Sequence, residues 1–480
     1  MTHADEAYRE TLARFGTVID FDLSSLDRTG VPVTSCSLAV DGRFAHHGNG
    51  YGATDQAARV SGLGELTEGV LGAQTVRGLE PETGSRRELV GRYGAGAVVD
   101  PRLLCLPAGA DYDDDQPVSW VVATRLRDDA PVRVPLAFVA SEPDELAADR
   151  GRSLITPITN GLGAGLDRDR AIAHGIGEII QRHTNGLRFR ALDARSPVIA
   201  TDTLPAPVRE LVDRFAGLGI TVVVKYAGTA FGSFSCYAMG LDDELADPIR
   251  LTAGGEAADP SPERALTKAV LEYANSRARK AFCFGSNLSA VRAVAPAAYW
   301  EALPPSRGEP RAVEAMRAWA ELPAERLRAL TAPDLSRTVS FAEVAGDPAP
   351  APASVADWVA RLEGREAYAV TGEVDGVWYA KTMITGAEVE TLSYGRIGED
   401  NARVSLEGDL DLVRVQDTPT GDHRARVALT AEAEERLGGP VWFSPARAAE
   451  IVGPLYPLYR EPPRHSVAVG AAAAGREVRA

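Results

Sequence analysis

The stretch TNGLGAGLDRDRAIAHGIGEIIQRH, residues 159–183, places a glycine-rich loop directly before a helix. Its side chains divide into two stripes at helical spacing, one apolar and one polar. The apolar stripe is Ile172, Ile176, Ile179 and Ile180, and the polar stripe is His174, Glu178, Gln181, Arg182 and Asn185. Backbone N–H groups at the start of such a helix can receive phosphate. The stretch lacks the GK[ST] ending of the Walker pattern, so the loop alone is weak evidence for nucleotide binding.

Two further helices with polar faces are predicted at 55–72 and 261–280, where an Asp or a Ser can cap each first turn. The first carries Ser61, Glu65 and Glu68 at i, i+4 and i+7. The second carries Lys268, Glu272, Asn275 and Arg279 at i, i+4, i+7 and i+11. Residues at these spacings lie on one face of a helix. Each helix therefore presents one stripe of chemically useful side chains.

Two interpretations of these faces stay open from spacing alone. Each face can be solvated and carry helical ion pairs, or the three faces can meet at one site. If they meet, two carboxylates ~4 Å apart repel by about 4 kcal/mol at an effective dielectric of ~20, so the cluster needs a cation. Magnesium with a polyphosphate fits that need, because Mg²⁺ prefers oxygen ligands and pairs carboxylates with phosphates.

The remaining sequence predicts a mixed α+β fold, because strand-like runs alternate with the helices. Strand-like runs occur at 118–126, 219–228, 234–241, 366–374 and 377–385, a further strand should end near Asp41 and Gly42, and short helices are expected at 5–15 and 354–364. The proline-rich segment 346–354 is expected to be a subdomain hinge or a long surface loop. We expect one domain over 15–465, a flexible tail over 466–480, and no repeat at a fixed period.

Composition narrows the classes of function. The 480 residues carry a net charge of −16, which disfavours nucleic acid and anionic membrane as main partners. The N-terminus does not resemble a signal peptide and no apolar run approaches the length of a membrane span, so we expect a cytoplasmic protein. Cys36, Cys105, Cys236 and Cys283 lack metal-ligand spacing and are expected to be buried thiols. His46, His47 and His465 are expected to be solvated, although His46 and His47 could also border a nucleotide pocket.

Five segments in order resemble the motifs of the YcaO family. They are LDRTGVPV (26–33), GNGYGATDQAARVSGLGELTEG (48–69), the opening stretch 159–183, DPSPERALTKAVLEYANSRA (259–278) and TLSYGRIGEDNAR (391–403). The resemblance implies a YcaO-type fold, with mixed sheets and helices that converge on an ATP and Mg²⁺ site.

The resemblance also implies roles for individual residues. Metal ligands are expected at Glu65, Glu68, Glu178, Gln181 and Glu272, and nucleotide contacts at Ser61, Asn160, Asn275, Arg182 and Lys268. Arg182 and Lys268 are also expected to act in catalysis by stabilising charge on the transferred phosphoryl group. The sequence departs from the family pattern at Asn49, Gly69, Gln181 and Asn275, which favours a retuned ATP site, with a catalytically dead site as the alternative.

The function implied is ATP-dependent activation of a peptide backbone amide, in the biosynthesis of a ribosomally made and later modified peptide. The product can be an azoline, a thioamide or an amidine. The alternative is a degenerate member that binds nucleotide or peptide as a scaffold. The C-terminus lacks the proline-rich tail of many azoline-forming members and no leader-binding domain is fused, so we expect a stand-alone or divergent member. The partner expected is a precursor peptide, with a separate leader-peptide-binding protein and a homodimer left open.

Overall fold

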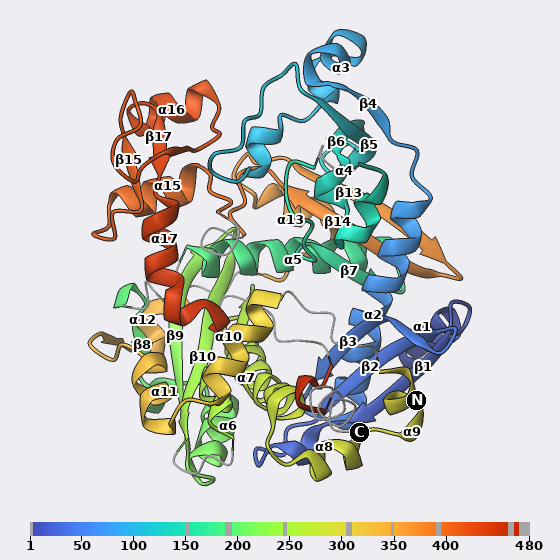
Figure 1. Ribbon diagram of the computed structural model, residues 1–480, viewed down its shortest axis with the longest axis vertical. Helices are drawn as coiled ribbons and strands as arrows, with labels where there is room; N and C mark the ends of the chain where they lie inside the picture. Colours follow the sequence, from blue (N-terminus) through green and yellow to red (C-terminus); the bar gives the residue numbers. More distant parts are fainter. Residues whose placement is uncertain are drawn as a thin grey trace, which may run out of the picture.

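The computed structural model describes residues 3–149, 153–187, 194–242, 247–303, 310–346, 350–389, 395–458 and 465–469. Within them the chain forms four sheets and three long helices, of which α5 crosses the middle of the molecule (Figure 1). The predicted α+β class is confirmed. None of the described helices is both long and apolar enough to span a membrane.

The first sheet is an antiparallel meander near the N-terminus. Its strands are β1 (Thr17–Asp22), β2 (Val33–Val40) and β3 (Arg43–Tyr51), flanked by α1 (His3–Ala13) and α2 (Asp55–Arg77). Asp41 and Gly42 join β2 to β3 with positive φ angles of 50° and 72°, as a two-residue hairpin requires. Helix α1 packs on α2 and buries Tyr8 and Leu12. The folded unit therefore begins before residue 15, where we expected it to start.

The second sheet has five strands. In order they are β11 (Gly254–Asp259), β10 (Ser233–Asp242), β9 (Ile220–Ala230), β8 (Val198–Ile199) and β12 (Thr338–Val339). It is packed by α6 (Ala206–Ala216) and α7 (Pro262–Phe284). The Arg277 guanidinium, which is fully buried on α7, lies 2.7 Å from the Asp242 carboxylate and 3.0 Å from Asp27. Asp242 also pairs with Arg28, and Asp27 also pairs with Arg250, so this buried network ties α7 to the end of β10 and to the loop between β1 and β2.

The third sheet combines strands from distant parts of the sequence. Its order is β4 (Glu82–Ser85), β5 (Pro117–Arg125), β13 (Ala367–Val374), β14 (Val377–Ile384) and β7 (Leu162–Gly165), with β6 (Pro131–Pro135) paired to β5. Helix α5 (Arg168–Gly186) packs on β7 and β14. Strands β13 and β14 follow the proline-rich segment 346–354 but lie between β5 and β7. The chain on both sides of that segment belongs to one sheet, which favours the surface-loop interpretation over the hinge. Its residues 347–349 lie outside the described residues.

The fourth sheet is small and lies beside the third. It consists of β15 (Val413–Val415), β17 (Val441–Phe443) and β16 (Ala425–Arg426), with α15 (Glu399–Leu406), α16 (Ala431–Leu437) and α17 (Pro445–Val452) around it. The Glu388 carboxylate is fully buried and accepts hydrogen bonds from the backbone N–H groups of Gly398 and Asn401 at 2.8 and 3.0 Å. It caps the start of α15, so the described part of the late segment 391–403 joins this subdomain to the third sheet. Residues 391–394 lie outside the described residues.

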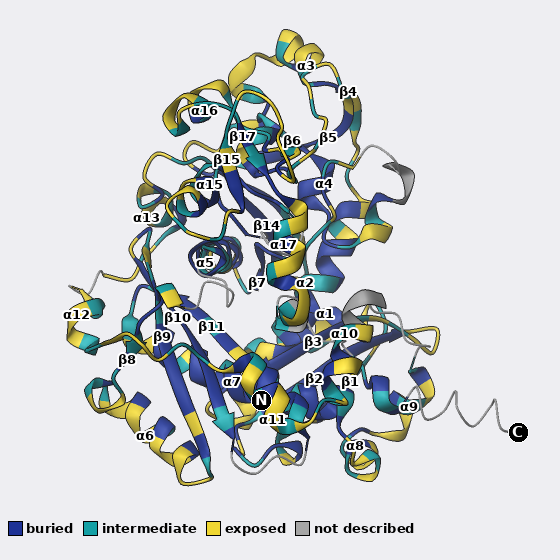
Figure 2. Cartoon of the chain, turned by 60° about the vertical axis from the view of Figure 1, so that its left-hand side comes forward, coloured by how far each residue is buried: buried dark blue, intermediate teal, exposed yellow. Residues whose placement is uncertain are grey.

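Of the remaining helices, α4 (Leu136–Val139) is buried in the core beside β5 and β6. The others are peripheral: α3 (Arg86–Tyr93), α8 (Leu288–Val294), α9 (Ala297–Ala302), α10 (Pro310–Ala320), α11 (Ala324–Thr331), α12 (Phe341–Ala345) and α13 (Val355–Ala360). The burial map shows their exposed outer faces around strands that are mostly buried (Figure 2).

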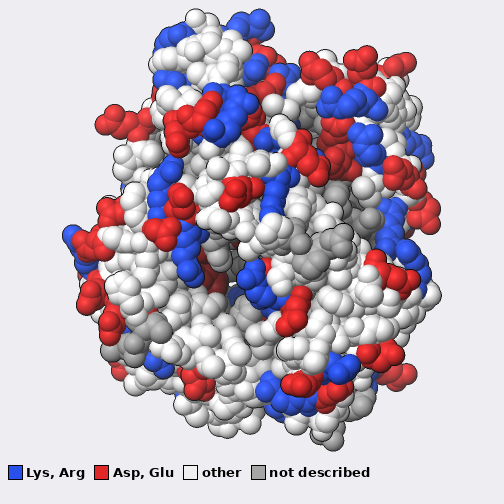
Figure 3. Space-filling view, turned by 180° about the vertical axis from the view of Figure 1, so that it is seen from behind, with Lys and Arg blue, Asp and Glu red and all other residues white. Residues whose placement is uncertain are grey.

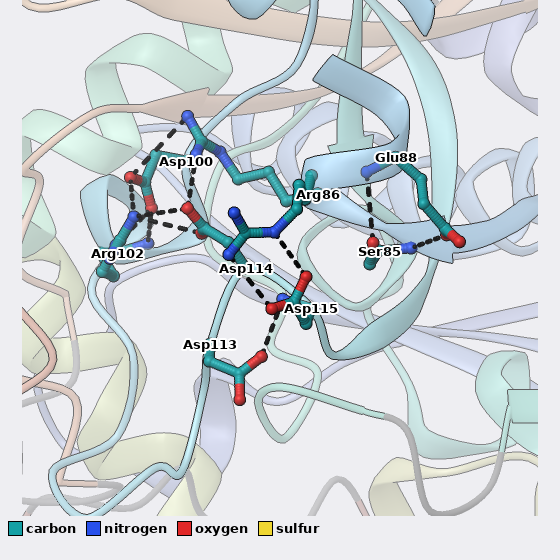
Figure 4. Close-up of polar contacts among 9 residues, drawn as sticks. Ser85, Arg86, Glu88, Asp100, Arg102, Asp113, Asp114 and Asp115 are labelled. Carbon is teal, nitrogen blue, oxygen red and sulfur yellow. Dashed lines mark hydrogen bonds and ion pairs between the residues drawn. The ribbon is translucent and has the colours of Figure 1, made fainter. Parts of the chain in front are cut away.

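The acidic run at 111–115 is held by arginines at the far edge of the third sheet (Figure 4). Asp114 lies 3.0 Å from Arg86 and 3.2 Å from Arg102, and Asp115 lies 2.5 Å from Arg87. These ion pairs connect the run to α3 and explain it as a structural feature.

The last described residues contradict two expectations. His465 donates or accepts a 2.8 Å hydrogen bond with the Tyr299 hydroxyl and stacks on Phe44, so it is not a solvated histidine. Val467 and Val469 are buried, and Val469 joins a core with strands β1 and β2. The expected flexible tail over 466–480 is therefore wrong for residues 466–469, because their apolar side chains complete that core; residues 470–480 lie outside the described residues.

Candidate functional site

The same strand–helix unit occurs three times, as β3–α2, β7–α5 and β11–α7. Each helix begins at a residue whose side chain caps the first turn: Thr54, Asp167 and Ser261. A glutamate follows eleven residues after each cap, at Glu65, Glu178 and Glu272. Because the caps fix where each helix starts, the three glutamates occupy equivalent places in the three units. The intervals between the units differ, so no repeat has a fixed period.

A glycine six residues before each cap lies on or next to the strand of each unit, at Gly48, Gly161 and Gly255. A Cβ on Gly48 would lie 2.5 Å from the backbone nitrogen of Leu66, and one on Gly255 would lie 2.1 Å from the carbonyl oxygen of Ala269. Any side chain would push these strands away from their helices. The glycines at these two places thus allow strand and helix backbones to touch.

This close approach anchors the glutamates to backbone N–H groups. The carboxylate of Glu65 accepts from Asn49 N–H at 2.9 Å, and that of Glu178 accepts from Gly161 N–H at 2.8 Å. The carboxylate of Glu68, on α2 of the first unit, accepts a hydrogen bond from the N–H group of Ala164, on β7 of the second unit, at 3.2 Å. A carboxylate held in this way is positioned before any ligand arrives.

The three units close on one another around a common centre. Helix α2 packs on its own sheet and also contacts β7 and β14; α5 packs on β7 and β14 and also contacts β9, β10 and β11; α7 packs on β10 and β11 and also contacts β3. The polar faces therefore meet. The prediction that the three helices converge is confirmed, and the interpretation of three separately solvated faces is wrong.

Glu68 lies at the acidic side of this centre. Burial raises its pKa well above the usual value, and the nearby carboxylates of Glu178 and Glu65 raise it further. The Nε2 atom of His174 lies 3.6 Å from the Glu68 carboxylate. The His174 side chain is 61% exposed, yet the surrounding protein and the cation of Lys268 lower its pKa to about 4. His174 is thus exposed to solvent where the polar faces of the three units meet, and we call this space the cleft.

Glu272 lies at the other side, among cations. Burial raises its pKa to about 7, against the opposing effect of Arg182. The Tyr51 hydroxyl donates to the Glu272 carboxylate at 3.2 Å. The Arg182 guanidinium lies 3.3 Å from the Glu256 carboxylate and 3.8 Å from that of Glu178. Arg182 therefore links α5 to β11 and pairs with Glu178 on its own helix.

The other predicted residues line the same faces. Ser61 and Lys268 are exposed one turn before Glu65 and Glu272, and Gln181 is partly exposed one turn after Glu178. Asn160 is buried beside Gly161. Asn275 is buried one turn after Glu272, and its Oδ1 atom has no hydrogen-bond partner within the described residues.

These donors suit a divalent cation with phosphate. Two carboxylates of this cleft, Glu68 and Glu272, have a raised pKa that a bound cation would lower, and Asn275 Oδ1 is a buried oxygen without a hydrogen-bond partner within the described residues. Seen from behind, the molecule is hollowed near its middle, and acidic and basic side chains are interspersed over this face (Figure 3).

The surroundings of two of the four departures from the family pattern are described. A Cβ on Gly69 would lie 3.4 Å from the Nδ1 atom of His46, which is an ordinary van der Waals contact, so the histidine lies beside this position without requiring glycine there. Asn49 supplies its backbone N–H to Glu65, which any residue but proline could do. His46 and His47 lie on β3, and His47 is buried 2.8 Å from the Ser37 hydroxyl, so the expectation of solvated loop histidines is wrong for His47.

Sequence reasoning missed two residues at this centre. Tyr51 follows the glycines of β3, and its position at the strand end next to a helix was a usable signal. Glu256 lies within strand β11, between glycine and alanine residues, and pairs with Arg182. The four cysteines are buried thiols as predicted.

Comparisons with known proteins agree with this geometry. The family model described as YcaO cyclodehydratase, ATP- and Mg²⁺-binding, matches residues 49–386. An uncharacterised protein of Methanothermobacter thermautotrophicus is 31% identical over 296 residues, which is 60% of this chain and 72% of the relative.

Two solved structures share the fold. YcaO from Methanopyrus kandleri, bound with AMPPCP and Mg²⁺, has a TM-score of 0.55 at 20% identity, over 83% of this chain and 94% of that one. A heterocyclase in complex with substrate and cofactor has a TM-score of 0.60 at 15% identity, over 85% of this chain. The match spans only 55% of that heterocyclase. The chain therefore belongs to the YcaO family, with ATP and Mg²⁺ as its cofactors.

Proposed function

We propose that this protein uses ATP and Mg²⁺ to activate a backbone amide of a precursor peptide, in the biosynthesis of a ribosomally made and later modified peptide. The observation that carries the proposal is the convergence of four anchored glutamates on one cleft. These are Glu65, Glu68, Glu178 and Glu272. Such a cluster repels itself unless it binds a cation.

The two walls of the cleft suggest a division of roles. Glu65, Glu68 and Glu178 would hold Mg²⁺ on one side, with Gln181 as a neutral oxygen ligand. Glu272 would complete the metal site from α7. Arg182 and Lys268 would contact the phosphates, with Ser61, Asn160 and Asn275 around the nucleotide. Bound Mg²⁺ would neutralise phosphoryl oxygens.

The residues of the protein would contribute to the reaction by positioning the reactants and by stabilising the charge that develops on them. An amide oxygen leaves poorly, whereas an oxygen that carries a phosphoryl group leaves well. Arg182 is already oriented by Glu256 and Glu178, so it can meet charge that develops on the transferred group. A nucleophile then replaces the oxygen. A side chain of the peptide gives an azoline, external sulfide gives a thioamide, and an amine gives an amidine.

The test uses a precursor peptide with heavy oxygen in its backbone amides, incubated with the protein, ATP and Mg²⁺. We expect mass spectrometry to find the heavy oxygen in the released phosphate and a changed peptide mass. Glu178→Gln is the inactive control. ATP hydrolysis that releases only unlabelled phosphate would exclude amide activation.

A non-catalytic scaffold is the second candidate, favoured by the neutral Gln181 and Asn275 and by Gly69. The two candidates differ in one measurement. A scaffold would bind MgATP, as measured by calorimetry, without any turnover in the presence of its peptide. The retained glutamates and the two cations Arg182 and Lys268 favour the enzyme.

A further inference from the structure

Strand β11 brings a carboxylate, that of Glu256, to the cleft. Glu256 stands directly after the glycine of its unit, where the other two units have Asn49 and Leu162. Burial raises the pKa of Glu272, and the backbone N–H group of Glu256 opposes the rise by donating to the Glu272 carboxylate. The backbone N–H group of Asn49 donates to Glu65 in the same way. This backbone role needs no charged side chain, so it does not explain the carboxylate of Glu256.

The Glu256 carboxylate faces helix α5 and contacts two of its residues. The Oε2 atom lies 3.3 Å from Arg182 Nη1 and 3.5 Å from Asn185 Nδ2. Both distances exceed the roughly 2.7–2.9 Å of a strong charge-assisted hydrogen bond. The side chain of Arg182 is 29% exposed and that of Glu256 is 39% exposed, whereas both partners of the buried Arg277–Asp242 pair are 1% exposed. The pair of Arg182 and Glu256 is therefore loose and open to exchange with a ligand.

Arg182 is shared between two carboxylates. Its guanidinium also lies 3.8 Å from Glu178, one turn earlier on α5. In the proposed site Glu178 binds Mg²⁺, and a carboxylate that shares its charge with a metal ion attracts an arginine less. Once MgATP is bound, the carboxylate of Glu256 still attracts Arg182 at full charge and competes with phosphate for it.

We infer that Glu256 is a positioning residue that competes with the γ-phosphate of ATP for the Arg182 guanidinium. This inference rests on the proposed contact between Arg182 and the transferred phosphoryl group. Glu256 holds Arg182 before ATP binds. The γ-phosphate has more negative charge and more acceptor oxygens than one carboxylate, so it draws the guanidinium away, and Asn185 keeps a donor at the released carboxylate. ADP lacks this group, and Arg182 stays with Glu256 when ADP is bound.

The competition weakens the binding of ATP, because only the fraction of Arg182 that leaves Glu256 can contact phosphate. A weaker contact in the bound ATP suits the transfer of a phosphoryl group. Charge develops on the transferred group in the transition state, and a contact that is completed only there raises kcat instead of lowering KM. Glu256 thus delays part of the Arg182 contact until the transition state.

Calorimetry in the presence of Mg²⁺ with two nucleotides, AMPPCP and ADP, tests the competition. Glu256→Gln keeps the shape of the side chain and removes its charge, so we expect AMPPCP to bind about 2- to 5-fold more tightly and ADP to bind as before. Glu434→Gln is the matched control, because Glu434 pairs with Arg426 at 2.7 Å at the fourth sheet, and it should change neither affinity. A merely structural role of Glu256 predicts weaker binding in Glu256→Gln. Equal or weaker binding of AMPPCP overturns the inference.

Direct repulsion between Glu256 and phosphate is a second way in which loss of this charge could tighten binding. A double-mutant cycle separates the two effects. In an Arg182→Met protein, the further change Glu256→Gln should leave the affinity for AMPPCP unchanged, because the group that is competed for is absent. A gain in affinity that persists without Arg182, or that is equal for ADP and AMPPCP, assigns the effect to repulsion and overturns the inference.

Turnover separates this inference from the proposed function. In the assay with the labelled peptide, Glu256→Gln should lower the KM for ATP without raising kcat. A peptide that is modified with an unchanged or raised KM for ATP retains the proposed function and overturns the role of Glu256. Tighter AMPPCP binding that depends on Arg182, in a protein that modifies no peptide, supports the role of Glu256 and overturns the proposed function.

Discussion

Helices α2 and α7 have the same geometry and opposite chemistry. At equivalent distances from their caps, α2 presents Ser61 and Glu68 around its glutamate, whereas α7 presents Lys268 and Asn275. The pKa of Glu68 is raised by burial and by other carboxylates, while cations oppose the rise at Glu272. The shared backbone geometry therefore fixes the positions of the side chains on each helix. Whether a helix face suits a metal ion or a phosphate depends on the one or two side chains that flank its glutamate.

The largest effect should come from the acidic wall. Glu65→Gln or Glu178→Gln keeps the shape of the side chain and removes a proposed metal ligand, so we expect kcat to fall by roughly 10²-fold or more with the fold retained. Glu263→Gln, in the exposed first turn of α7, is the matched control. Turnover at the wild-type rate in either variant would remove that glutamate from the metal site.

The cationic wall should respond differently. Lys268→Met should raise the KM for ATP by about 10- to 100-fold, because it removes a charged contact to phosphate, while the Mg²⁺ concentration needed for half-maximal activity stays the same. Lys268→Arg should recover most of the affinity. A shift in the Mg²⁺ dependence of Lys268→Met would show that the two walls do not have separate roles.

The shared backbone geometry can be broken directly. Gly255→Ala places a Cβ 2.1 Å from the carbonyl oxygen of Ala269, so β11 and α7 must separate, and we expect a loss of about 1–3 kcal/mol in the free energy of unfolding. Gly91→Ala on α3 meets no atom within 4 Å and should be neutral or slightly stabilising. Chemical denaturation measures both.

The smallest effect concerns stability against pH without Mg²⁺. Glu68 and Glu272 have raised pKa values in the folded protein, so it binds more protons than the unfolded chain between the usual glutamate pKa and about 7. The stabilisation that Glu68 and Glu272 contribute to the folded protein is fully present at low pH and is lost as the pH rises through this window. We expect this contribution to lower the melting temperature from pH 5 to pH 8, and MgATP to make the fall smaller. Equal slopes with and without MgATP would contradict the proposed cation site.

The sequence predicted the three polar helix faces, because periodicity and caps are local properties. It could not predict from spacing that they converge, since convergence depends on how three sheets pack. Recognition of the family supplied that step. The sequence does show that Thr54, Asp167 and Ser261 are equivalent, because each stands six residues after a glycine and eleven residues before a glutamate. A search for a repeat of fixed period misses this, because the intervals between the three units differ. Glu256 was not predicted as a site residue, because a charged residue within a strand gives no sign of which helix it will face.

The burial of Val469 beside β1 and β2 has a consequence for synthesis of the protein. During translation the first sheet emerges early, but one of the side chains that cover it emerges more than four hundred residues later. Until then Ile19 and Phe21 lack part of their apolar cover. The nascent chain must therefore keep this surface from aggregating, through a chaperone or a transient contact, and the final packing step waits until residue 469 has left the ribosome.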